Sequence, residues 1–211
     1  MLATFVQKRK FMMTREEILS IVRIWQMTII KSNGMKEFYN KAIDNLKIYV
    51  SEANPIVNHW LRSDMDASEY TFDSLFYEGV IIQPLYRWIN NAHIQIQDGI
   101  FADKGYLSGT SDFDSFINHV EGEHIACLQF DIPDSFERID VCSLLPNYND
   151  ESEIILPRGL QFRVEEIQTY STYSEIDDFL NNVGSYSSAK EICDIYGIKR
   201  ITYYRLSLIR H

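Results

Sequence analysis

Apolar residues in the first third of the chain recur at helical spacing. One set repeats every three or four positions and predicts an amphipathic helix: Ile18, Val22, Trp25 and Ile29. Thr14 and Glu17 fit a capping box at the start of this helix, and Asn33-Gly34 fits its end. We predict three further helices: residues 36–51, residues 54–62, and one opened by residues 66–69 that carries Phe72, Leu75 and Phe76.

After Gly79 the pattern changes to short apolar runs, rich in β-branched and aromatic residues, between turn residues. Such runs are typical of strands, and we predict strands over residues 85–89, 104–108, 124–131, 151–156, 161–168 and 201–209. A helix is predicted over residues 174–196, with a break near Gly184-Ser185. Helices followed by a series of short strands indicate an α+β fold. We expect one domain, 1–211, with a helical part at 1–72 and a β-rich core at 73–211.

The composition is that of a globular protein. Of the 211 residues, 45% are hydrophobic and 24% are charged, which is enough for a sizeable core. No run reaches the roughly 18 apolar residues of a membrane helix. The basic start lacks the apolar stretch of a secretory signal. We therefore expect a cytoplasmic protein, which a specialised injection route could place in a host cell. The scattered histidines and the widely spaced Cys127, Cys142 and Cys193 predict no metal site and no disulfide.

The net charge of −10 is unevenly distributed. Residues 1–62 carry +5, residues 63–198 carry −19 and residues 199–211 carry +4. A site built from the middle segment would lie in a negative field, which repels nucleic acid phosphates and attracts a cationic partner. The same charges would also suit a plain solubilising surface.

The first segment with candidate chemistry is Pro84-Leu85-Tyr86-Arg87-Trp88, which places an arginine inside an apolar strand. Burying a charge is costly unless it meets an opposite charge. The planar fork of a guanidinium is suited to hold a diphosphate through two parallel hydrogen bonds. Arg87 is therefore either part of an internal salt bridge or a diphosphate ligand.

The second segment, residues 104–111, ends a predicted strand with a cluster of small hydroxyls. Strand alternation puts Tyr106 and Ser108 on one face. That face would offer an aromatic ring beside a hydroxyl, as a pocket for a flat ring needs. Taken alone, the segment is better explained as a turn capped by hydroxyls.

The third segment contains Glu151-Ser152-Glu153 ahead of the apolar run Ile154-Ile155-Leu156. On a strand, residues two apart leave the same face about 7 Å from each other. Two neighbouring carboxylates repel, so without a purpose the pair weakens the strand. Two carboxylates at this separation can serve two substrates or two steps. The alternative is a solvated edge strand.

In this order, the three segments resemble the mono-ADP-ribosyltransferases of the Arg–Ser–Glu class, the branch related to arginine-modifying toxins. That family has an aromatic-Arg pair, then an aromatic-x-Ser-Thr-Ser strand, then Glu-x-Glu followed by an apolar stretch and Pro. The corresponding segments here are Tyr86-Arg87, residues 106–110 and residues 151–159. The resemblance covers residues 73–209, and its third motif is the most specific. The leading helices are also similar to those of phage-encoded Mod-type members.

The resemblance implies an ADP-ribosyltransferase fold, in which N-terminal helices pack on two mostly antiparallel β-sheets that form a cleft for NAD⁺. It implies transfer of ADP-ribose from NAD⁺, the co-substrate, to a target protein, without a metal. A glutamate at position 151 implies that the acceptor is an accessible arginine. The alternatives are modification of a nucleic acid base, or an inactive protein of this fold that acts by binding a partner.

By the same resemblance, Glu153 binds the nicotinamide ribose and stabilises the positive charge that develops on the sugar. Ser108 orients Glu153, Arg87 holds the diphosphate, and Glu151 binds and helps to deprotonate the acceptor. Further candidates are Tyr86, Tyr106 and Thr110 for NAD⁺, and Tyr148 for the protein substrate.

The chain departs from the family pattern at two positions. Trp88 follows the arginine where the family usually has Gly, and Gly109 replaces the middle Thr of the hydroxyl triplet. A shifted register would make Thr110 or Ser111 the candidate hydroxyl. Tyr77-Glu78-Gly79 is a rival first motif, but its glutamate would repel the diphosphate, so we prefer Arg87.

Overall fold

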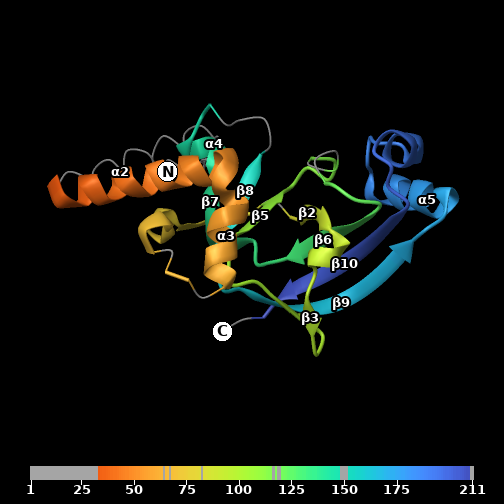
Figure 1. The fold of residues 1–211 in the computed structure, drawn as a ribbon, viewed down its shortest axis with the longest axis horizontal. Coiled ribbons are helices and arrows are strands. Elements are labelled where there is room, and N and C mark those ends of the chain that lie inside the picture. The colour runs from red at the N-terminus through yellow and green to blue at the C-terminus, as the bar shows by residue number, and fades with distance from the viewer. Residues whose placement is uncertain are drawn as a thin grey trace, which may run out of the picture. The chain divides into compact units, whose positions relative to one another are not determined.

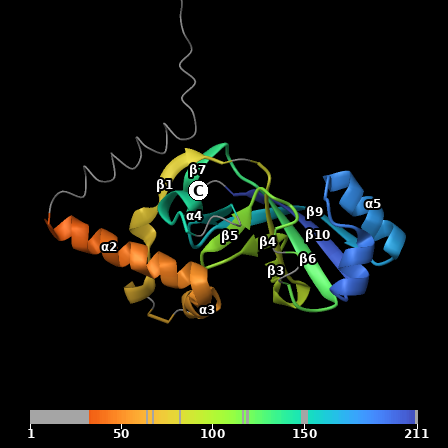
Figure 2. The same ribbon diagram turned by 90° about the horizontal axis from the view of Figure 1, so that it is seen from above.

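A computed structural model describes residues 33–63, 65–66, 68–81, 83–115, 117, 120–147 and 152–209 (Figures 1 and 2). The chain divides into two compact units, Met1–Lys41 and Ala42–His211. The first unit contributes the described start of helix α2 (Asn33–Ile48). The second contains the end of α2 and all the elements that follow.

The helical elements of the second unit are short. After α2 come η1 (Tyr49–Ala53), α3 (Asn54–Arg62), η2 (Ser68–Tyr70), η3 (Asp73–Leu75), η4 (Asn91–His93), α4 (Val141–Leu144), α5 (Tyr173–Val183) and η6 (Glu191–Ile195). No helix in the described part of the chain is long and apolar enough to cross a membrane.

Ten strands form one hydrogen-bonded sheet, in the order β1-β7-β8-β5-β2-β6-β10-β9-β4-β3. The strands are β1 (Tyr77–Val80), β2 (Leu85–Asn90), β3 (Ile96–Gln97), β4 (Ile100–Ala102), β5 (Leu107–Thr110), β6 (His124–Asp131), β7 (Ser135–Asp140), β8 (Glu153–Leu156), β9 (Gln161–Tyr170) and β10 (Arg200–Leu208). Among the described pairs, β6 and β10 run parallel and the others antiparallel. The α+β class predicted from the sequence is confirmed.

The two sheets implied by the resemblance are joined at one point. Strands β2 and β5 share the single register pair Tyr86 and Thr110. This junction separates the half that contains β8 and β5 from the half that contains β2, β6, β10 and β9. Both halves contribute to one core cluster, so they pack against each other; its members include Leu107, Leu156, Leu128, Phe130, Phe162 and Leu206.

A second core cluster lies under α5, which Figure 1 shows beside the ends of β9 and β10. Ile176, Phe179 and Leu180 of this helix are buried and belong to the same cluster as Trp88 and Ile201. The helix starts at a capping box formed by Thr172 and Glu175 and ends at Gly184, whose φ of 75° is left-handed. The helix predicted over 174–196 therefore stops where the glycine permits a left-handed turn.

Other predicted elements changed for tertiary reasons. The helix expected before Asn33 lies outside the described residues, and the helix expected from residue 66 is wrong beyond the short turns η2 and η3. Phe72 is buried and its ring stacks on Tyr106 at 4.1 Å. Its backbone N–H donates to the Tyr106 hydroxyl at 3.2 Å, which replaces the helical bond that the local pattern favours.

Candidate active site

The three segments with candidate chemistry lie on adjacent strands. Arg87 is on β2, Ser108 is on β5 and Glu153 opens β8, and these strands follow one another as β8-β5-β2 in the sheet. Thr110 of β5 lies opposite both Glu153 and Tyr86. The segments that are remote in sequence therefore meet at the junction between the two halves of the sheet.

Tyr49 is buried beside the start of β5, where its hydroxyl lies 3.5 Å from the Tyr106 carbonyl oxygen. Tyr49 follows α2 and its side chain is fully buried. Burial raises the pKa of Tyr49 to about 12, while the Arg87 cation and the Ser108 side chain act to lower it and the Glu153 carboxylate acts to raise it. Such effects extend over several ångströms in a protein interior. They agree with the strand order β8-β5-β2, which places Glu153, Ser108 and Arg87 on neighbouring strands.

Two polar atoms of this group are buried without an ordinary hydrogen bond. Arg87 Nη1 and Ser108 Oγ have no partner of standard geometry among the described residues. A buried donor left unpaired costs about 1–3 kcal/mol, so native proteins rarely keep one without a reason. A guanidinium with a free N–H is matched chemically to a phosphate oxygen, and the free hydroxyl to a sugar hydroxyl or a carboxylate. These residues fit a dinucleotide.

Glu153 is 9% exposed, which is low for a carboxylate. Strand β8 begins at this residue, and the preceding Ser152 has a left-handed φ of 46°. In the described part of the chain, the strand predicted over residues 151–156 therefore begins at Glu153. Glu151 and Tyr148 lie outside the described residues.

Tyr106 lies in the core, and not on the cofactor side that its strand pattern suggested. Its ring is fully buried and is stacked on Phe72 at 4.1 Å and on Phe76 at 5.9 Å. Its hydroxyl donates to Asp73 at 2.6 Å, and Asp73 also pairs with Arg158 at 2.7 Å. These contacts hold the ring as packing beneath the site.

The remaining NAD⁺ candidates flank the junction. The half-buried Tyr86 ring meets Phe113 edge-on at 5.0 Å. Thr110 is fully buried, and its Oγ1 accepts from the Asp112 backbone N–H at 3.1 Å. Thr110 is thereby engaged in shaping the loop after β5, and the candidate of the shifted register, Ser111, is exposed.

Both departures from the family pattern have a physical reason. Trp88 packs under α5, and its Nε1–H donates to the Phe113 carbonyl at 2.7 Å. It leaves β2 on the opposite face from Arg87, so it does not crowd that residue. A Cβ on Gly109 would lie 3.2 Å from the Tyr86 carbonyl oxygen, which explains a glycine where β5 crosses close to β2.

The rival first motif lies elsewhere. Glu78 is exposed on β1, the outermost strand of the sheet on that side, and accepts a hydrogen bond from Ser135 at 3.0 Å. Strand β7 separates β1 from β8. In the described part of the chain, no three His, Cys, Asp or Glu side chains are grouped so that they could hold a metal ion.

Sequence reasoning did not identify Tyr49 or Asn58 as part of this region. Both residues lay inside helices predicted over 36–51 and 54–62, and neither was assigned a part in the chemistry. The signal in the sequence was the polar Asn58 on the inner side of a short amphipathic helix. Such a residue is too common to indicate a functional site.

Solved structures share this fold. The Vis toxin of Vibrio splendidus, an ADP-ribosyltransferase, superposes with a TM-score of 0.50 at 13% identity, over 94% of this chain and 87% of that one. The ADP-ribosylating toxin BECa of a C. perfringens binary enterotoxin, solved with NADH, superposes with a TM-score of 0.53 at 14% identity. That match covers 82% of this chain and 44% of BECa. The fold is therefore that of the ADP-ribosyltransferase toxins.

A comparison of the sequence with protein-family models identifies the family. Residues 31–185 match the family model of the ADP-ribosyltransferase exoenzymes, and no curated protein is close enough in sequence to count as a relative. The chain belongs to the ADP-ribosyltransferase exoenzyme family. Its members are mono-ADP-ribosyltransferases that use NAD⁺.

Proposed function

We propose that this chain transfers ADP-ribose from NAD⁺ to an arginine side chain of a target protein and releases nicotinamide. The supporting observation is that Arg87, Ser108 and Glu153 lie on three adjacent strands, and that Arg87 Nη1 and Ser108 Oγ are buried without a hydrogen-bond partner in the described part of the chain. Membership of the ADP-ribosyltransferase exoenzyme family supplies the reaction class.

Each residue of the group has a distinct part in this proposal. Arg87 holds the diphosphate, since its buried Nη1 lacks a partner among the described residues. Ser108 orients the carboxylate of Glu153. Glu153 binds the ribose and stabilises the positive charge that grows as the bond from the sugar to nicotinamide breaks.

The acceptor nitrogen forms the new bond to the sugar and loses a proton. An arginine is strongly basic and stays protonated in water, so it needs a carboxylate beside it to become a nucleophile. We assign this task to Glu151, two positions before Glu153 in the sequence. Tyr148 on the preceding segment is our candidate contact for the target protein.

Two observations favour arginine as the acceptor. Residues 63–198, which contain the site, carry a charge of −19, and this field attracts a guanidinium and repels nucleic acid. A protein of the same fold, Vis, has been solved with agmatine, with a TM-score of 0.51 at 12% identity. Agmatine carries the same guanidinium group as arginine.

The test is incubation of the protein with labelled NAD⁺ and a cell lysate. We expect label on protein, at arginine by mass spectrometry, and we expect Glu153→Gln to lose it together with hydrolysis of NAD⁺. Glu165→Gln, an exposed glutamate on β9, is the matched control and should keep both. Label that is removed by nuclease and resists protease would replace the proposal with modification of a base.

A second variant tests the separate roles proposed for Glu151 and Glu153. Glu151→Gln should keep hydrolysis of NAD⁺, because water needs no deprotonated guanidinium, and should lose transfer to protein. Equal loss of both activities would refute the part assigned to Glu151.

A further inference from the structure

Strand β5, which carries Ser108, is paired along one edge only over most of its length. Its four residues have register partners on β8, from Glu153 to Leu156. Among the described pairs, its other edge shares one with β2, between Thr110 and Tyr86. A short strand with so little pairing needs support from outside the sheet.

The place of the Ser108 hydroxyl depends on the backbone of this strand. Its Oγ is buried and has no hydrogen-bond partner among the described residues. A hydroxyl that no hydrogen bond holds takes its position from the backbone through the side-chain rotamer and from the packing around it. A group that fixes the backbone of β5 therefore also fixes the Ser108 hydroxyl.

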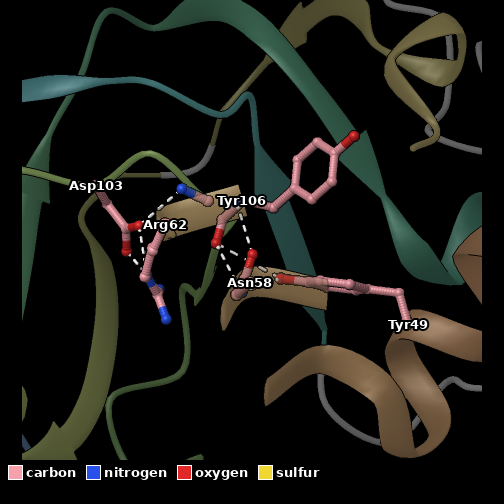
Figure 3. Close-up of polar contacts among 6 residues, drawn as sticks. Tyr49, Asn58, Arg62, Asp103 and Tyr106 are labelled. Atoms are coloured by element: carbon pink, nitrogen blue, oxygen red, sulfur yellow. Dashed lines mark hydrogen bonds and ion pairs between the residues drawn. The ribbon is translucent and has the colours of Figure 1, made fainter. Parts of the chain in front are cut away.

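Asn58 of α3 holds the backbone immediately before β5. The strand begins at Leu107, so Tyr106 lies outside the register pairs with β8. Asn58 Oδ1 accepts from the Tyr106 N–H at 2.9 Å, and Asn58 Nδ2 donates to the Tyr106 carbonyl at 3.2 Å (Figure 3). A carboxamide has the same donor and acceptor groups as a peptide, so Asn58 binds Tyr106 as a neighbouring strand would.

The Asn58 carboxamide is itself held in one orientation. The side chain is fully buried, and its Nδ2 also donates to the Tyr49 hydroxyl at 2.9 Å (Figure 3). The Tyr49 ring meets Phe72 edge-on at 5.1 Å and Tyr106 at 5.7 Å. A Cβ on Gly105 would lie 2.5 Å from Asn58 Oδ1, so a glycine is needed for this approach. The carboxamide therefore acts as a fixed template two residues before Ser108.

Arg62 makes a second attachment one turn further along α3. It forms two hydrogen bonds to Asp103, at 2.7 Å and 2.6 Å (Figure 3). Asp103 Oδ1 also accepts from the Gly105 N–H at 2.8 Å. The Asp103 backbone pairs with the turn after β8, donating to the Leu160 carbonyl at 3.2 Å and accepting from the Gly159 N–H at 3.0 Å. Helix α3 is thus attached to the chain that enters β5 and, through Asp103, to the chain that leaves β8.

We propose that Asn58, supported by Arg62, is a positioning residue of the site, which holds the backbone of β5 and through it the Ser108 hydroxyl. This inference rests on the proposed function, because Ser108 orients the Glu153 carboxylate there. It gives α3 a task beyond completing the core.

The proposal separates turnover from binding of NAD⁺. Arg87, to which we assign the diphosphate, lies on β2, and this strand is paired with β6 along its whole length, from Leu85 to Asn90. Its position therefore does not depend on α3. Loss of the Asn58 carboxamide should lower kcat and leave KM for NAD⁺ nearly unchanged.

The experiment compares Asn58→Ala with Asn45→Ala in the full-length chain. Asn45 of α2 also binds backbone through its carboxamide, since its Nδ2 donates to the carbonyls of Glu69 at 2.8 Å and Thr71 at 3.0 Å, but these residues precede β1 and not β5. We expect Asn58→Ala to lower kcat for NAD⁺ hydrolysis about tenfold, with KM within about twofold, because a small displacement of a reacting group is costly. Tm should fall in both variants, and Asn45→Ala should keep wild-type kcat.

A double-mutant cycle tests whether Asn58 acts through Ser108. In a Ser108→Ala background, Asn58→Ala should have little further effect on kcat. Full additivity of the two losses, or an Asn58→Ala kcat equal to that of Asn45→Ala, would overturn the proposal.

Arg62→Gln gives a second variant at a half-exposed position, which decides the matter if Asn58→Ala does not fold. It removes the bidentate pair with Asp103 and should lower kcat in the same direction by a smaller factor, again with little change in KM. Wild-type kcat in this variant would then overturn the proposal.

Amide exchange gives a measurement that does not depend on turnover. Peptides that contain Leu107–Thr110 should exchange faster in Asn58→Ala and in Arg62→Gln, and unchanged in Asn45→Ala. A wild-type chain without NAD⁺ turnover would count against the proposed function. In that event the exchange result alone decides whether α3 holds β5, and unchanged β5 protection would refute it.

Discussion

Arg87 shows how one side chain can combine burial with an unused bonding capacity. It extends from an apolar strand, and its Nη1 is buried without a partner among the described residues. The sequence left two interpretations of Arg87: it forms an internal salt bridge, or it binds a diphosphate. No ion pair of Arg87 is described in the part of the chain that the structure covers, and the proposed function assigns the buried N–H to the diphosphate of NAD⁺.

Arg87→Lys tests whether Arg87 binds the diphosphate of NAD⁺. A lysine keeps the charge and loses the planar fork, so the affinity for NAD⁺ should fall about tenfold or more, as expected when a buried charge-assisted hydrogen bond is lost. Titration calorimetry with NAD⁺ measures this change. Arg163→Lys, at an exposed position on β9, should bind as the wild type does. Equal affinities in the two variants would place the diphosphate elsewhere.

Prediction at single residues was weakest where packing decides the position of a side chain. The segments of Arg87, Ser108 and Glu153 lie on adjacent strands, and the parts assigned to these residues stay predictions. The aromatic assignment of Tyr106 followed strand alternation, but β5 begins only at Leu107. Tyr106 is instead held by contacts with Asn58 and Phe72, which are remote in sequence and invisible to a local pattern.

At the scale of elements, strand prediction worked best in the centre of the sheet. Strand β6 was predicted at its observed bounds, and β2 and β9 to within two residues at one end. Their continuous apolar or alternating patterns reflect burial on one or both faces. Edge strands such as β1, whose burial alternates only weakly, carry too little pattern to be predicted.

The contact between α3 and the start of β5 makes a prediction at this scale. In Gly105→Ala, the new Cβ would lie 2.5 Å from Asn58 Oδ1, so the carboxamide clamp must move. We expect a loss of about 1–3 kcal/mol in the free energy of unfolding, by urea denaturation, from overpacking. The comparison is Gly99→Ala, which has φ +74° and no neighbour within 4 Å.

Gly99→Ala should cost about 1 kcal/mol from backbone strain alone. It should leave amide exchange of β5 unchanged, whereas Gly105→Ala should accelerate it. If the two variants exchange alike, α3 does not order β5.

The start of α5 predicts a pH dependence. Backbone hydrogen bonds from Ser171 and Thr172, with one from the Thr172 side chain, lower the pKa of Glu175 below its ordinary value of 4.5. A lowered folded pKa stabilises the protein above 4.5, and this contribution is lost as the pH falls through the folded value. Glu175→Gln should therefore lower Tm at pH 7 and have a smaller effect at pH 3. A difference of the same size at both pH values would contradict the capping assignment.

At the scale of the whole molecule, charge acts differently on the two substrates of the proposed function. The chain carries −10 overall, with −19 over residues 63–198. NAD⁺ is itself anionic and needs a local cation, which we assign to Arg87. A basic acceptor is instead drawn by the summed field of many carboxylates, and salt screens such a long-range attraction.

Raising the salt concentration should therefore affect the two substrates differently. Between about 0.03 M and about 0.3 M NaCl the screening length falls about threefold. We expect KM for an arginine-rich peptide to rise several-fold over this range, and KM for NAD⁺ in the hydrolysis assay to change less. Steady-state assays with each substrate varied in turn measure both values. If the KM of the peptide is insensitive to salt, the acidic segment serves solubility, and the acceptor is selected by contacts close to Glu153 alone.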